Sequence, residues 1–121
     1  HIEVVNFVDF ETLENDIYFA IIHGGQGTVY AMASQGIPFI GIPFFNEQFW
    51  NLKKFSEKNC AYLVKDPNSV NIQEVMNYFE QHYSMFKDNI VELSRNIKCE
   101  SEGSLKKAEA EIEEFVRNRE L

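Results

Sequence analysis

The chain has 121 residues, with 11 basic and 19 acidic side chains and a net charge of -8. This length suits one domain or part of one, and a hydrophobic fraction of 45% excludes global disorder. The acidic balance argues against a general nucleic-acid binder, because phosphate affinity needs surplus Lys and Arg. Residues 1–52 contain no Lys or Arg at all. An anion bound by this half must therefore be held without a basic side chain of its own.

Cysteine usage and hydropathy indicate the compartment. Cys60 and Cys99 are far apart and form no CxxC pattern, so free thiols in a reducing compartment are expected. No apolar run approaches the ~18 residues of a membrane span, and no signal peptide is recognisable. We predict a cytoplasmic protein, with a peripheral position at a membrane as the alternative. The chain opens on His1 rather than Met, which predicts a fragment of a longer protein.

The first half of the chain predicts strands alternating with helices. Strands are expected at 2–8, 18–22, 37–42 and 60–64, and the continuous apolar run at 18–22 suits a strand buried on both faces. One helix is expected over 28–34, ended by Gly36. A second is expected to be capped by Asn46 and to run to about Lys58.

The second half predicts helices. Apolar residues recur at helical spacing in three groups, which are 72, 75, 76 and 79, then 86, 90, 93 and 97, then 105, 108, 112, 115 and 116. Gly103 is expected to separate the last two helices. The order of elements predicts an α/β fold, namely a Rossmann-like, doubly wound parallel sheet with helices on both faces. We divide the chain into a βα core at 1–66 and a mostly helical tail at 67–121.

The segment most typical of a binding site is His23-Gly24-Gly25-Gln26-Gly27-Thr28, between an expected strand and an expected helix. Open α/β sheets bind ligands at the carboxyl ends of their strands, and a helix start offers unpaired N–H groups. Glycines allow a phosphate to approach the backbone, while His23 and Thr28 add donors. The segment predicts a diphosphate cradle without Lys or Arg. A glycine-rich turn that only links strand to helix is the alternative, since neither the GxGxxG nor the P-loop pattern is present.

Further motifs follow at defined spacing, namely Gly36-Ile37-Pro38, then Pro43-Phe44-Phe45-Asn46-Glu47-Gln48, then Asn51. Together with the segment at 23–28, this order resembles the donor-binding signature of the UDP-glycosyltransferase family. The resemblance covers nearly the whole chain, and its specific core is 23–48. It implies the GT-B architecture, with these residues forming part of the C-terminal domain that binds the nucleotide sugar.

The resemblance also implies roles for individual residues. The diphosphate would be held by His23, Gly25, Gly27 and Thr28. Phe7 would lie near the position of the family's aromatic residue that stacks on uracil. Val8 would present backbone groups to the edge of the base. Glu47 and Gln48 would bind hydroxyls of the transferred sugar, because a carboxylate and an amide together accept and donate hydrogen bonds. Without the family spacing, the preferred interpretation of Glu47 and Gln48 is simply the first turn of a helix, where an acidic residue suits the dipole.

The activity implied is transfer of a sugar from a UDP-sugar to an acceptor small molecule or lipid, with inversion. The general base would be a His on an N-terminal domain outside these residues, so this chain would contain no catalytic residue and would be inactive alone. It would need that missing domain or a partner subunit, but no metal, no cofactor and no nucleic acid. One departure is Ala31, which stands where the family has a Glu that grips the ribose. Ala31 favours the alternative of a non-catalytic or degenerate nucleotide-binding module that acts with a partner chain.

Overall fold

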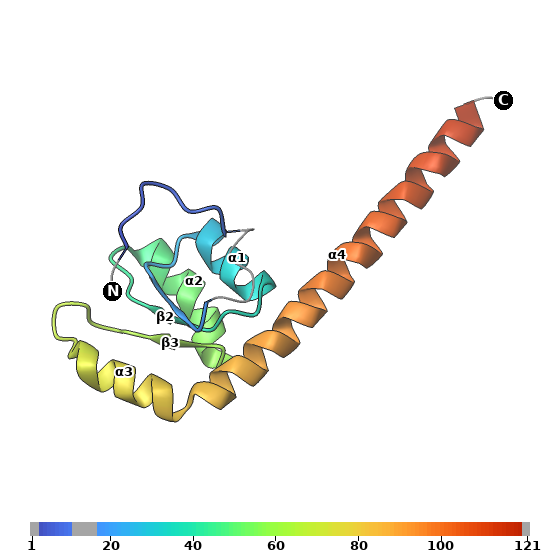
Figure 1. Ribbon diagram of the computed structural model, residues 1–121. Coiled ribbons are helices and arrows are strands. Elements are labelled where there is room, and N and C mark those ends of the chain that lie inside the picture. Colours follow the sequence, from blue (N-terminus) through green and yellow to red (C-terminus); the bar gives the residue numbers. More distant parts are fainter. Residues whose placement is uncertain (1–2, 11–16, 120–121) are drawn as a thin grey trace.

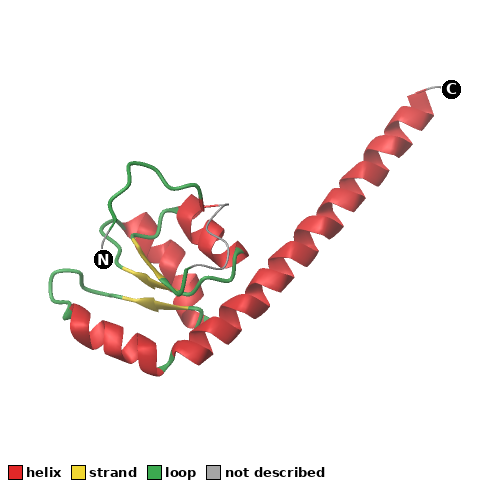
Figure 2. Ribbon diagram, in the orientation of Figure 1, coloured by secondary structure: helices red, strands yellow, loops and turns green. Residues whose placement is uncertain are grey.

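The computed structural model describes residues 3–10 and 17–119. A parallel sheet is formed by β1 (Ala20–Ile22), β2 (Phe39–Gly41) and β3 (Ala61–Leu63), in the order β1-β2-β3. The helices are α1 (Gln26–Ser34), α2 (Asn46–Glu57), α3 (Ile72–Gln81) and α4 (Tyr83–Arg119) (Figures 1 and 2). The alternation of strands and helices confirms the predicted α/β class.

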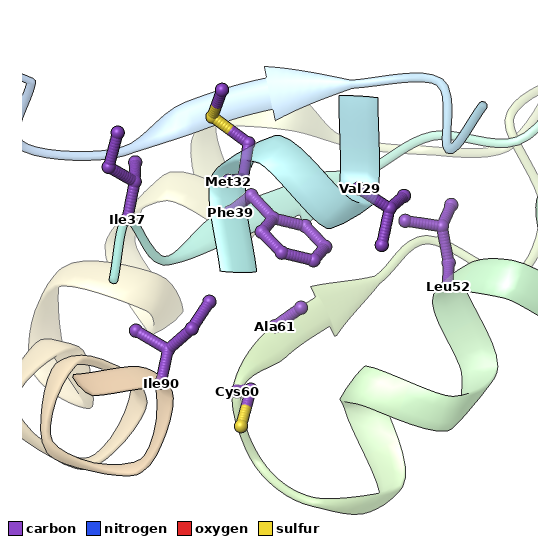
Figure 3. Packing of buried hydrophobic residues seen from close by; sticks show 8 residues of the cluster. All are labelled: Val29, Met32, Ile37, Phe39, Leu52, Cys60, Ala61 and Ile90. Carbon is purple, nitrogen blue, oxygen red and sulfur yellow. The ribbon is translucent and has the colours of Figure 1, made fainter. Parts of the chain in front are cut away.

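Two hydrophobic clusters cover the two faces of the sheet. Successive strand residues point to opposite faces, and Phe39 and Ile40 on β2 accordingly belong to different clusters. Around Phe39 pack residues of α1 and α2 (Figure 3), because right-handed crossovers in strand order bring both helices to the same face. Around Ile40 pack residues of α3, and α4 contributes Phe86 to this cluster and Ile90 to the other. Helices therefore lie on both faces, as predicted.

The end of α1 follows the prediction made for Gly36. Gly36 has a φ of 68°, the left-handed conformation that glycine adopts readily. The Ile37 N–H donates to the Met32 carbonyl at 3.0 Å and the Gly36 N–H to the Ala33 carbonyl at 3.2 Å, which is the hydrogen-bond pattern of a Schellman motif. α4 packs against this end, where Ser94 Oγ donates to the Ser34 carbonyl at 2.6 Å. The orphan carbonyls of α1 are thus satisfied partly by a distant helix.

Two strand predictions are wrong. Residues 3–8 of the segment predicted at 2–8 have no regular structure, while Ile2 lies outside the described residues. β1 is not buried on both faces, since Ile21 is 49% exposed. Phe19 packs into the cluster around Ile40, but α3 does not extend over Ile21. An apolar run indicates that a strand is present, whereas the burial of that strand depends on which helices cover it.

Two helix predictions are also wrong. The N-cap of α2 is Phe45, and Asn46 is already the first helical residue. Gly103 does not divide the tail, because α4 continues through it from Tyr83 to Arg119. A helical Gly costs only ~1 kcal/mol relative to Ala, which the surrounding Glu, Lys and Ala residues outweigh. The distal part of α4 projects away from the body (Figure 1), and no helix within the described ranges is long and apolar enough to cross a membrane.

Candidate functional site

The turn between β1 and α1 presents free backbone donors at the carboxyl edge of the sheet. Gly25 is the N-cap of α1, with no side-chain cap, and its carbonyl accepts the first helical hydrogen bond from the Val29 N–H at 3.0 Å. The N–H groups of Gln26, Gly27 and Thr28 therefore have no acceptor within the helix. Gln26 and Gly27 are exposed and Thr28 is half-buried. The arrangement suits an anion, because these donors point outward at the positive end of the helix dipole.

The three glycines of this turn differ in whether the surrounding structure leaves room for a side chain. Gly24 has a φ of +102°, and a Cβ there would lie 2.6 Å from Leu52 Cγ and 2.9 Å from the Gln48 carbonyl oxygen. A Cβ added at Gly25 or Gly27 would meet nothing within 4 Å. Packing of this chain therefore requires glycine at 24 but not at 25 or 27. The open space over Gly25 and Gly27 leaves room for a bound group to approach the backbone.

α2 holds this turn in place. Asn51 Nδ2 donates to the Gly24 carbonyl oxygen at 3.0 Å. The fully buried Leu52 fills the space beside Gly24 and also beside Gly41, where a Cβ would lie 2.4 Å from Leu52 Cδ2. The motif spacing in the sequence includes Asn51 but gives no role to Leu52. The signal available was their position in the helix after the second strand of the βαβα unit, where a helix faces the first turn.

His23 follows β1 directly and is exposed. Its Nδ1 lies 3.2 Å from the Ile42 carbonyl oxygen. Its ring is 5.0 Å from the Phe44 ring in an edge-to-face arrangement. The loop after β2 therefore orients the imidazole beside the glycine turn, as the carboxyl ends of adjacent parallel strands meet at one edge.

Glu47 and Gln48 lie in the first turn of α2, at the same edge of the sheet. Gln48 Oε1 accepts hydrogen bonds from the backbone N–H groups of Phe44, at 2.9 Å, and Phe45, at 3.3 Å. The Gln48 side chain thus caps its own helix, and its NH₂ group remains the part suited to a ligand. The Glu47 carboxylate is exposed. Both predicted roles, helix start and sugar contact, are compatible with this geometry.

Phe7 and Val8 are both exposed. They lie in a segment without regular structure, and Phe7 is 84% exposed. At the end of this segment Gln35 Nε2 donates to the Phe10 carbonyl. Gln35 is the C-cap of α1, so this contact lies at the end of the helix opposite the glycine turn. Their predicted contacts with uracil stay a prediction.

Cationic and metal-binding groups are scarce around the turn. A cavity of about 230 Å³ between α1 and α2 is lined by Gln26, Asn51 and Lys54, among others. Lys54 is thus a basic side chain that shares a cavity with the first residue of α1. Within the described ranges, no three His, Cys, Asp or Glu side chains gather in a way that would hold a metal ion.

A parallel sheet with a glycine-rich helix start at its carboxyl edge defines an α/β domain of the type that binds ligands at that edge. A model of the UDP-glucoronosyl and UDP-glucosyl transferase family matches residues 18–118. The chain belongs to this family. The resemblance suggested by the motifs between His23 and Gln48 is thereby confirmed.

Curated relatives of the chain are UDP-glucuronosyltransferases. The chain is 34% identical to human UDP-glucuronosyltransferase 2B10 and 32% identical to human 2B17, each over 77 residues that make up 62% of this chain and 14% of the relative. It is 33% identical to mouse 2B17 over 76 residues, which are 61% of this chain and 14% of that relative. The matched part of the chain spans about one seventh of the length of these relatives.

Proposed function

We propose that this chain is the donor-binding part of a glycosyltransferase that moves a sugar from a UDP-sugar to an acceptor small molecule or lipid. The observation that carries the proposal is the glycine turn, where three backbone N–H groups and the open space over Gly25 and Gly27 face solvent at a helix start. Family membership supports a UDP-sugar as the donor, since the family description names UDP-linked sugars. The predicted diphosphate contacts of His23 and Thr28 belong to this proposal.

The chemical contribution of this chain would be charge stabilisation. In the proposed inverting transfer, an acceptor oxygen forms a bond to the anomeric carbon while the bond from that carbon to the UDP oxygen breaks. Negative charge then develops on the departing diphosphate, where preorganised N–H donors and a helix dipole stabilise it. Glu47 and Gln48 would orient the sugar through its hydroxyls. The acceptor proton would pass to a base on a domain or partner subunit outside this chain.

The chain alone is therefore expected to bind donor without turnover. Calorimetric titration with UDP should show binding that is much weaker for uridine, because uridine lacks the phosphates. No binding of UDP up to millimolar concentration would overturn the proposal. A hydrolysis assay with UDP-glucose should show no release of glucose by the isolated chain, and activity there would refute the assignment of the base to another domain. The cytoplasmic location stays a prediction.

The second candidate is a degenerate nucleotide-binding module that works with a partner chain. Ala31 is half-buried and packs against the cluster around Phe39, so it offers an apolar methyl where the family resemblance implies a carboxylate. Ala31→Glu is expected to tighten UDP binding by roughly tenfold to a hundredfold, the effect of one hydrogen bond involving a charged group. Uridine, which retains the ribose, should gain by the same factor. An unchanged affinity for both ligands would show that the ribose is held elsewhere.

A further inference from the structure

The hydrogen bond of His23 determines which nitrogen of its ring carries the proton. Nδ1 lies 3.2 Å from the Ile42 carbonyl oxygen. A carbonyl oxygen can only accept, so Nδ1 must be the donor. In the neutral imidazole with its hydrogen on Nδ1, the other nitrogen, Nε2, is an acceptor. Nε2 becomes a donor only when His23 is protonated.

This tautomer is poorly matched to a phosphate when it is neutral, because phosphate oxygens are acceptors too. The protonated ring instead offers an N–H donor together with a positive charge. No Lys or Arg occurs in residues 1–52, so no basic side chain before Lys53 can take the place of that charge. We infer that binding of a nucleoside diphosphate at the glycine turn is coupled to uptake of one proton at His23 Nε2. The inference rests on the proposed function and adds a pH dependence to that same site.

The titratable groups on the elements around His23 are not expected to take up the proton in its place. The loop at 42–45 carries no titratable side chain, and α1 carries only Tyr30. α2 carries Glu47 in its first turn, followed by Lys53, Lys54 and Glu57, and Lys53 Nζ lies 3.9 Å from Glu57 Oε1. The segment at 3–10 adds Glu3 and Asp9. Of these groups none is a histidine, the residue type whose charge ordinarily changes between about pH 5 and 8.

The first test needs no ligand. Nitrogen chemical shifts of the imidazole ring, measured by NMR at a pH where His23 is neutral, report which nitrogen carries the hydrogen. We expect the hydrogen on Nδ1. His82 serves as an internal reference, because its Nδ1 lies 2.9 Å from the Tyr78 carbonyl oxygen and should show the same tautomer. A hydrogen on Nε2 of neutral His23 would overturn the inference, whether or not the chain binds UDP.

The second test measures binding of UDP-glucose across the pH range. Its diphosphate is esterified at both ends and keeps a constant charge, whereas the terminal phosphate of UDP itself titrates near ~6. Affinity should be roughly tenfold weaker at about pH 8 than at about pH 5.5. Calorimetry in two buffers with different ionisation enthalpies should show net uptake of a proton at an intermediate pH.

Two variants separate His23 from other sources of pH dependence. His23→Gln supplies a neutral donor at every pH and should bind with little pH dependence, while His82→Gln should keep the dependence of the unmodified chain. Circular dichroism checks that both fold, and the buffer experiment on the unmodified chain stands without them. Binding that is independent of pH, or an unchanged slope in His23→Gln, would overturn the coupling alone. No binding at any pH would overturn the proposed function, and the coupling with it.

Discussion

Replacing single glycines of the turn should separate folding from binding. Gly27→Ala places a methyl where nothing lies within 4 Å, so the fold should tolerate it. Gly27 is helical, and Ala is favoured over Gly in a helix by up to ~1 kcal/mol. The free energy of unfolding should therefore stay equal or rise by about 0.5–1 kcal/mol. The same methyl would occupy the space through which a phosphate approaches the backbone.

The expected loss of UDP affinity follows from the donors involved. A hydrogen bond to a charged group contributes ~1.5–3 kcal/mol, and each 1.4 kcal/mol corresponds to about a tenfold change. Gly27→Ala should thus weaken UDP binding by roughly tenfold to a hundredfold, with uridine affected less. Isothermal titration calorimetry gives the affinities, and urea denaturation gives the stability of the same preparation.

Gly24→Ala is the matched contrast. The new Cβ would lie 2.6 Å from Leu52 Cγ and 2.9 Å from the Gln48 carbonyl oxygen, at a φ of +102°. Overpacking costs ~1–3 kcal/mol and a non-glycine residue at such a φ a further ~1–3 kcal/mol, so a loss of about 2–6 kcal/mol in unfolding free energy is expected. Equal destabilisation by Gly24→Ala and Gly27→Ala, or an unchanged UDP affinity in Gly27→Ala, would refute the distinction between the two glycines.

Other parts of the structure lead to three further predictions. Ser94→Ala should destabilise the fold by ~1–3 kcal/mol, because it leaves the Ser34 carbonyl without its buried donor. Urea denaturation measures this loss in unfolding free energy, and a change below about 0.5 kcal/mol would contradict the role of Ser94. Burial raises the pKa of the Cys60 thiol, whereas Cys99 is exposed. One thiol should therefore react with a thiol reagent at about pH 8 in the folded chain, and two after unfolding. Cys99→Ser should abolish the reaction of the folded chain, and a fast reaction remaining in that variant would contradict this prediction. Added salt should weaken UDP binding only modestly, since backbone donors rather than Lys or Arg would hold the phosphates; calorimetry between low and physiological salt tests this, and a steep dependence would point to Lys54.

Local sequence chemistry determined several features correctly. Gly36 ends α1 because a left-handed residue there lets the backbone satisfy its last carbonyls, which depends on neighbours close in sequence. The order of apolar runs and helical periods gave the α/β class, because each element needs one apolar side to be buried. The position of the glycine turn between β1 and α1 also followed from the sequence, since the end of an apolar strand followed by glycines is itself a local pattern, while the ligand of that turn stays a prediction.

The tertiary structure decided what depends on residues far apart in the chain. Gly24 differs from Gly25 and Gly27 because Leu52 and the Gln48 carbonyl oxygen pack beside it, at a φ of +102°. Ile21 is exposed because, among the described residues, α3 covers Phe19 on that side of the strand but does not extend over Ile21. An apolar run in the sequence does not show which helices will cover it. The half of the chain without Lys or Arg was visible in the sequence at once. The contact of His23 Nδ1 with the Ile42 carbonyl oxygen at 3.2 Å could be seen only in the tertiary structure, because it requires the ends of two strands to lie side by side.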